Sequence, residues 1–161
     1  MEFTTGISEF NTTYNLNAID DYNKYLKGGF VLDHKKINNV VDDSIKKLRI
    51  KTPNMQEHIA NLSGGNQQKV IVARWLANDP DILIMDEPTR GIDVGAKHEI
   101  YEIMNDLAAE GKAIIMVSSE MAELLGMSDR VYVMCNGKMR GEITETAEMT
   151  QEHVMAYATK F

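Results

Sequence analysis

The chain has 161 residues, of which 43% are hydrophobic and 25% charged, so it can bury the core of a soluble domain. Its formal net charge of −7 argues against nucleic acid or an anionic membrane surface as a direct partner. A lone cysteine, Cys135, excludes a disulfide framework and fits a reducing compartment. No apolar run is long enough to span a bilayer, so any membrane attachment would go through another protein.

The first region, residues 1–61, is polar and contains one clear amphipathic helix. Between His34 and Leu48 the apolar residues recur three and four positions apart, which is the spacing of one helical face. This stripe predicts a helix that packs on one side against a core.

From Leu62 onward the pattern alternates between helices and strands. Predicted helices cover 65–77, 94–110, 120–125 and 150–159, and predicted strands cover 82–85, 113–118, 131–135 and 138–143. The all-apolar run 113–118 is typical of a parallel-sheet strand that is covered on both faces. Asn136-Gly137 predicts a two-residue hairpin turn. The order of these elements predicts an α/β fold, with residues 62–161 as its second region.

The sharpest motif is the run Leu62-Ser63-Gly64-Gly65-Asn66-Gln67-Gln68 at the start of the first of these helices. Two glycines let a ligand approach the backbone closely, and a helix start presents free N–H groups and a positive dipole end. Ser63 adds a hydroxyl donor, so the motif predicts an anion site. An ordinary helix cap is the alternative interpretation of the same residues.

A second motif is the apolar strand 82–85, which ends in Asp86-Glu87-Pro88. A carboxylate at the end of a buried strand is a common way to hold Mg²⁺ beside nucleotide phosphates, which suits Asp86. Glu87 could then activate the attacking water as a general base. A surface-facing acidic pair before the Pro88 turn is the alternative.

Together these motifs resemble those of the ATP-binding-cassette (ABC) ATPases, with 62–68 as the signature, 82–87 as the Walker B strand and Arg90 to Asp93 as the D-loop. The match extends in order and spacing from about Lys51 to Ile143. The residues within and around these motifs resemble those of the second ATPase half of bacterial monosaccharide importers of the ribose and galactose type. Residues 27–30 and 48–53 favour the galactose/methylgalactoside branch.

This resemblance implies a partial nucleotide-binding domain. Residues 1–61 would be part of the helical, permease-facing subdomain, and residues 62–161 would carry the signature helix, Walker B, D-loop and C-terminal part of the ATPase core. The chain would act within an ATP-hydrolysing subunit that powers sugar import, located peripherally on the cytoplasmic face of the inner membrane. Its partners would be an N-terminal cassette of the same polypeptide, the permease and, indirectly, a periplasmic sugar-binding protein.

The resemblance also implies roles for single residues. Residues of the signature would complete an ATP site whose Walker A loop belongs to the other cassette; these are Ser63, Gly64, Gly65, Asn66 and Gln67. Asp93 would communicate across the cassette dimer. Asp86 would hold Mg²⁺ and Glu87 would be catalytic at this half's own site. Gly65→Asp is expected to abolish turnover, and Glu87→Gln to spare most of it.

Two departures from the family pattern matter. A Walker A loop needs two glycines five residues apart, and no pair of glycines in this sequence has that spacing. The chain alone is therefore expected not to bind ATP tightly. Ser119 stands where the family has a histidine that senses the γ-phosphate, and a hydroxyl cannot replace an imidazole there. Ser119 is expected to cap the next helix, and this half's own site to be weak.

Two rival functions stay open from the sequence. A chromosome-maintenance or repair ATPase head also carries the signature and Walker B in a separate lobe, although residues 1–61 lack the heptads of the coiled coil that should precede it. The other rival is a stand-alone interaction module that works without nucleotide.

Overall fold

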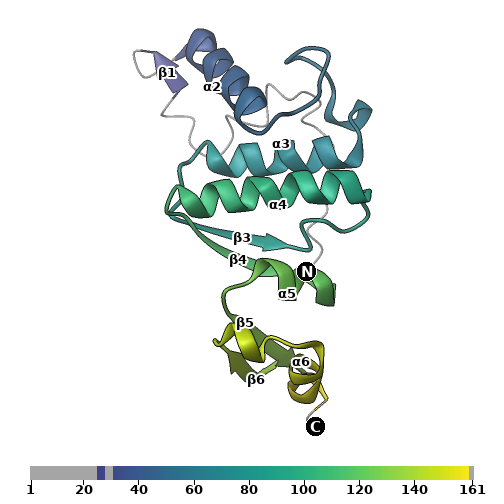
Figure 1. The fold of residues 1–161 in the computed structure, drawn as a ribbon. Helices are drawn as coiled ribbons and strands as arrows, with labels where there is room; N and C mark the ends of the chain where they lie inside the picture. The colour runs from purple at the N-terminus through teal and green to yellow at the C-terminus, as the bar shows by residue number, and fades with distance from the viewer. Residues whose placement is uncertain (1–24, 28–30, 160–161) are drawn as a thin grey trace. The chain divides into compact units, whose positions relative to one another are not determined.

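The computed structural model describes residues 25–27 and 31–159. The chain divides into two compact units, Met1–Ile115 and Met116–Phe161, here named unit 1 and unit 2. Figure 1 shows the elements of each. Within the described residues, no helix has the length and apolar character needed to cross a membrane.

The described part of unit 1 is built mainly from three helices and two pairs of strands. Its elements are β1 (Leu26–Lys27), β2 (Val31–Leu32), α2 (His34–Lys47), the 3-10 turn η2 (Ile59–Asn61), α3 (Gly64–Leu76), β3 (Ile82–Asp86), α4 (Val94–Ala109) and β4 (Ala113–Val117), which ends just beyond the boundary. The short strands β1 and β2 are antiparallel, whereas β3 and β4 form a separate two-stranded sheet.

The helices of unit 1 pack in sequence order. α3 lies against α4 on one side and against α2 on the other, as Figure 1 shows. The predicted stripe of α2 supplies the buried residues Ile37 and Val41, which form a core cluster with Tyr25. Asp33 caps α2 by accepting a hydrogen bond of 3.1 Å from the backbone N–H of Lys36. The prediction of an amphipathic helix in this region is confirmed.

The sheet of unit 1 differs from the prediction that the strand at 113–118 is covered on both faces. Along β3, Leu83 and Met85 are buried, but the alternating Ile82 and Ile84 are 58% and 73% exposed. In β4, Ile115 is 52% exposed. Because side chains alternate across a strand, one face of this sheet carries the core contacts and the other is open. An apolar run alone does not distinguish these two cases.

Unit 2 is a hairpin with a helix packed on it. It contains α5 (Met121–Met127), β5 (Val131–Cys135), β6 (Lys138–Ile143), the 3-10 turn η3 (Thr146–Glu148) and α6 (Gln151–Ala158). Asn136 and Gly137 both have positive φ, 51° and 71°, as the predicted hairpin turn requires. Thr150 caps α6 through the N–H of His153, also as predicted. The core of this unit is formed by Val131, Val133, Ile143 and Val154.

Candidate functional site

The helix α3 begins directly after Ser63, in the middle of the signature motif. Ser63 occupies the N-cap position with extended backbone angles, but its side chain accepts no capping N–H among the described residues. Ser63 is thus the helix cap by position, as the alternative interpretation expects, but its side chain makes no capping hydrogen bond. The hydroxyl is available for another role at the positive end of a 13-residue helix.

Asn66, in the first turn of α3, connects this serine to an earlier part of the chain. Its Nδ2 donates to Ser63 Oγ at 2.8 Å, and its Oδ1 accepts from the backbone N–H of Lys51 at 2.8 Å. The side chain of Gln67 turns the other way, because its Nε2 donates to the carbonyl of Leu62 at 2.8 Å. Asn66 is only 8% exposed, and both its amide oxygen and its amide nitrogen form hydrogen bonds within the protein.

A cavity of about 230 Å³ opens where the start of α3 meets the start of α4. Its lining comes from the signature, the D-loop, the first turn of α4 and two charged residues outside both motifs: Lys51, Ser63, Gly65, Asn66, Asp93, Gly95, Ala96 and Glu99. The structure thus brings together four of the predicted site residues, namely Ser63, Gly65, Asn66 and Asp93. It also adds Lys51 and Glu99, which the sequence motifs do not include.

The glycines of the signature have different surroundings. A Cβ at Gly65 would lie 2.4 Å from the Cβ of Ala96 in α4, whereas one at Gly64 would lie 3.3 Å from Ile92 Cγ2. Gly65 is buried and Gly64 is exposed. Gly65 therefore permits the close packing of two helices, and Gly64 is the glycine whose backbone faces solvent.

An ion-pair network adjoins the cavity and extends from its lining residues Lys51 and Glu99 to the buried Lys69. Lys69 is 1% exposed, and its Nζ donates to Glu99 Oε2 at 2.6 Å and to the carbonyl of Arg49 at 3.0 Å. Lys51 Nζ reaches the other oxygen of Glu99 at 3.1 Å. Hydrogen bonds from Lys69 and then from Lys51 hold the pKa of the Glu99 carboxyl below its ordinary value. Periodicity could have located Lys69, since it falls on the same face of α3 as Asn66 and Ala73.

The acidic residues of the Walker B motif lie at the end of β3, and the D-loop follows them. Asp86 ends the strand and is exposed, and Glu87 has a positive φ of 47°. That angle is uncommon for a residue with a side chain, and such strain often occurs at functional sites. Asp93 caps α4, because its Oδ1 accepts from the N–H of Ala96 at 2.9 Å. Asp86 and Glu87 do not line the cavity at α3.

Ser119 belongs to unit 2, and its predicted role as a helix cap is wrong. The N-cap residue of α5 is Glu120, and the backbone N–H of Glu120 donates to the hydroxyl of Ser118 at 3.0 Å. The turn before α5 is thus stabilised one residue earlier than expected.

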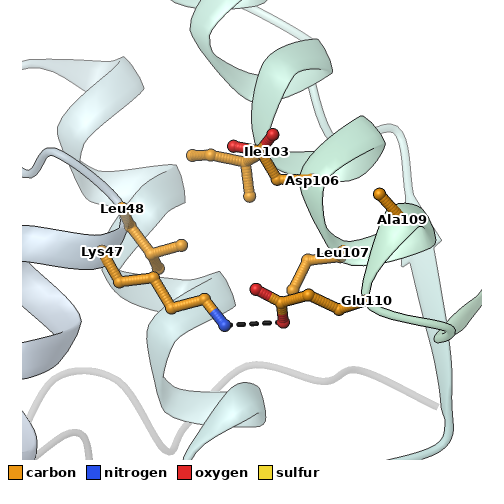
Figure 2. A pocket seen from close by; sticks show the side chains of 7 residues that line it. All are labelled: Lys47, Leu48, Ile103, Asp106, Leu107, Ala109 and Glu110. Carbon is orange, nitrogen blue, oxygen red and sulfur yellow. Dashed lines mark hydrogen bonds and ion pairs between the residues drawn. The ribbon is translucent and has the colours of Figure 1, made fainter.

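A second cavity, also of about 230 Å³, lies between the ends of α2 and α4, as Figure 2 shows. Its lining combines apolar and charged side chains: Lys47, Leu48, Ile103, Asp106, Leu107, Ala109 and Glu110. Lys47 and Glu110 form an ion pair of 2.7 Å that links the two helices. Both cavities are lined by one lysine and two carboxylates, so the helix ends make the difference, and the negative end of α4 disfavours an anion here. The cavity at the start of α3 is therefore the candidate phosphate site.

Known proteins resemble this chain over nearly its whole length. It is 54% identical over 158 residues to the galactose/methyl galactoside import ATP-binding protein MglA of Clostridium tetani, covering 98% of this chain and 31% of that protein. It is 55% identical over 130 residues to the ribose import ATP-binding protein RbsA of the same organism, covering 81% and 26%. The chain therefore spans less than a third of the length of these relatives.

Solved structures show the same fold. A dimeric ATP-binding cassette bound to ADP and phosphate superposes with a TM-score of 0.70 at 22% identity, covering 84% of this chain and 57% of that one. The ATP-binding cassette of another ABC transporter gives a TM-score of 0.74 at 20% identity, covering 92% and 62%. The predicted fold, a partial ABC-ATPase cassette, is confirmed.

The family assignment rests on the sequence profile described as ABC transporter. It matches residues 6–90, just over half of the chain, and begins well before Lys51, where the motif resemblance starts. The signature helix and the Walker B strand both lie within this match. The chain belongs to the ABC transporter family.

Proposed function

We propose that the chain supplies the signature side of an ATP site in the ATP-hydrolysing subunit of a sugar importer. The observation that carries this proposal is the cavity where Ser63, Gly65 and Asn66 of the signature meet Asp93 of the D-loop. The Walker A loop facing it would come from the other cassette of the same polypeptide.

The charges around the cavity suit a phosphate group. The start of α3 contributes its positive dipole end and the hydroxyl of Ser63. The two carboxylates are engaged, since Asp93 caps α4 and Glu99 is paired with Lys51 and Lys69. A volume of about 230 Å³ is smaller than the roughly 300–1,000 Å³ that usually encloses a whole small molecule, so the cavity fits the terminal phosphate of a longer ligand.

The end of β3 would serve this half's own ATP site. Asp86 is exposed there, and one carboxylate with phosphate oxygens and water is a usual ligand set for Mg²⁺, which would neutralise phosphate charge. Within the described residues no group of three or more acidic, histidine or cysteine side chains could hold a metal by itself, so the remaining ligands would be phosphate and water. Glu87 would take a proton from the attacking water. Ser119, in place of an imidazole, would leave this half's site the weaker one.

The proposed substrate is galactose or a methyl galactoside. The relative named for that import matches 98% of this chain, while the relative named for ribose import matches 81% at similar identity. The helical subdomain, residues 1–61, would dock on a membrane permease at the cytoplasmic face of the inner membrane, where a periplasmic binding protein delivers the sugar from the opposite side. Uptake of labelled methyl galactoside and of labelled ribose by cells lacking the gene would decide between the two sugars.

Ser63→Ala in the full-length transporter tests the ATP-site proposal. A hydrogen bond to a charged acceptor contributes about 1.5–3 kcal/mol, so its loss should cost about tenfold or more in kcat/KM for Mg-ATP. Ser44→Ala is the matched control, because that hydroxyl donates to the carbonyl of Val40 within α2 and does not line the cavity. Equal kinetics for the two variants would refute the role of Ser63.

A further inference from the structure

Asn66 holds the serine of the signature in a defined hydrogen-bond arrangement. Its side chain bridges the backbone N–H of Lys51 and the hydroxyl of Ser63, each at 2.8 Å. Lys51 lies fifteen residues earlier and Ser63 three residues earlier, so the amide joins two separate segments of unit 1. The sequence motif places Asn66 among the ligand-binding residues, whereas in the structure its amide oxygen and one of its two N–H groups are already engaged within the protein.

The direction of these bonds is fixed by chemistry. A backbone N–H can only donate, so the Asn66 atom facing Lys51 must be the amide oxygen. The amide nitrogen then faces Ser63 and donates to its Oγ. Ser63 is therefore an acceptor toward Asn66, and its own proton must point elsewhere.

We propose that Asn66 is a positioning residue that turns the Ser63 hydroxyl into a hydrogen-bond donor aimed at a phosphate oxygen in the cavity. Both residues line that cavity, where Ser63 is exposed and Asn66 is buried. A serine hydroxyl can donate or accept, and an anion such as phosphate can only accept. Fixing the donor direction before the ligand arrives removes the cost of reorienting the hydroxyl on binding. This inference rests on the proposed function of the cavity.

Asn66→Asp is the substitution that reverses the arrangement at nearly constant shape. The carboxylate still accepts from Lys51, but it cannot donate, so it accepts the proton of Ser63 and turns that hydroxyl away from the cavity. Asn66→Leu removes both hydrogen bonds and leaves the hydroxyl free to rotate. A merely structural role predicts the larger defect for Leu, whereas the positioning role predicts the larger defect for Asp.

The added negative charge of Asp also repels phosphate, so the test is a double-mutant cycle with Ser63→Ala. ATP turnover by the full-length transporter is measured for the wild type, both single variants and the double variant. We expect Asn66→Asp to raise KM for Mg-ATP at least about tenfold when Ser63 is present, and severalfold less in the Ser63→Ala background, where only the charge acts. Equal fold changes in both backgrounds overturn the inference. No effect of Ser63→Ala alone overturns instead the proposed function on which it rests.

A spectroscopic measurement covers the case in which Asn66→Asp does not fold. In the 161-residue chain, the side-chain amide protons of Asn66 are observed by nitrogen-correlated NMR with and without Ser63→Ala. We expect one of the two proton resonances to shift when its acceptor is removed, while the amide of Lys51 stays in place. An unchanged Asn66 side-chain resonance would show that the bond to Ser63 does not exist in solution.

Discussion

Gly65→Ala tests the close packing of α3 on α4, where the structure leaves no room for one methyl group. The added Cβ would lie 2.4 Å from Ala96 Cβ and 3.6 Å from its Cα. Carbon atoms in contact prefer about 3.5–4.0 Å, so the helices would have to separate by about 1 Å. Neither Cβ can rotate away, because each is fixed to its helix backbone.

The expected cost follows from two opposing effects. Overpacking of a buried contact costs about 1–3 kcal/mol, and the better helix propensity of alanine returns at most about 1 kcal/mol. We therefore expect Gly65→Ala to lower the free energy of unfolding by about 1–2 kcal/mol. Denaturant unfolding of the chain, followed by circular dichroism, measures this difference as a lower midpoint at unchanged slope.

Two further variants make the reasoning refutable. Gly64→Ala is the matched control, since its Cβ would approach only Ile92 Cγ2 at 3.3 Å on an exposed part of the helix start, and it should change stability little. Ala96→Gly makes room for the new methyl, so combining it with Gly65→Ala should cost less than the sum of the single changes. Equal midpoints for Gly65→Ala and wild type, or strictly additive losses in the double variant, would show that the packing account is wrong.

Four further predictions follow from other parts of the chain. Glu99→Gln should destabilise the fold by about 1–3 kcal/mol near neutral pH, because it weakens the pairing of the buried Lys69. The pKa of Glu99 is held below the ordinary value of a glutamate by its hydrogen bonds to Lys69 and Lys51. Its contribution to stability is therefore present above the pKa of the unfolded chain and is lost as the pH falls through the lower pKa of the folded chain, so the variant should lose less stability than the wild type on acidification from about pH 5 to 3. Gly137→Ala should cost about 1 kcal/mol in thermal unfolding, because φ is +71° there. Ile84→Thr should reduce self-association of the chain in light scattering, because it removes a side chain that is 73% exposed on the open face of β3. Calorimetric titration of the chain with Mg-ATP should show no micromolar binding, since the sequence has no Walker A spacing.

Each of these has a control and a contradicting result. Glu102→Gln removes an exposed partner of Arg49 and should leave the acid dependence unchanged, so identical pH profiles for the two glutamine variants would contradict the role of Glu99. Gly126→Ala, in the open space of a helix, should be neutral or stabilising, and an equal loss at Gly137 and Gly126 would exclude the turn as the cause. Val94→Thr changes an exposed residue outside the sheet and should not affect association. Micromolar binding of Mg-ATP to the chain would show that Walker A is dispensable for affinity.

Local signals in the sequence were sufficient for most element positions. The stripe of α2, the Thr150 cap and the Asn136-Gly137 turn each act over a few residues, and each element appears where these signals predict it. The exposure of Ile115 could not be predicted in this way, because the coverage of a strand depends on which distant elements pack on it. The prediction for Ser119 was wrong because Ser118 and Ser119 carry identical hydroxyl groups, and only the backbone geometry determines that Ser118 accepts the hydrogen bond from the N–H of Glu120.

The motifs predicted only some of the residues that line the candidate site, and they did not predict the contacts between them. Spacing of the motifs identifies Ser63 and Asp93, and the structure brings them to one cavity. The bond from Asn66 to Lys51 joins segments with no common sequence signal, and the contact of Gly65 with Ala96 depends on the crossing of two helices. Structural roles that depend on long-range contacts can therefore be recognised only once the fold is known. The ligand-binding roles assigned to the signature and D-loop residues stay predictions.

The different surroundings of the signature residues determine which substitutions can test ATP binding without also disturbing the packing of the helices. A loss of turnover in Gly65→Asp would be ambiguous, because any side chain at that position collides with Ala96 before it reaches a ligand. Ser63 is exposed, lines the cavity and accepts only from Asn66 in the described hydrogen bonds, so removing its hydroxyl creates no clash. A contrast between Ser63→Ala and Glu87→Gln therefore tests the proposed division into a shared site and this half's own site without changing how α3 packs on α4.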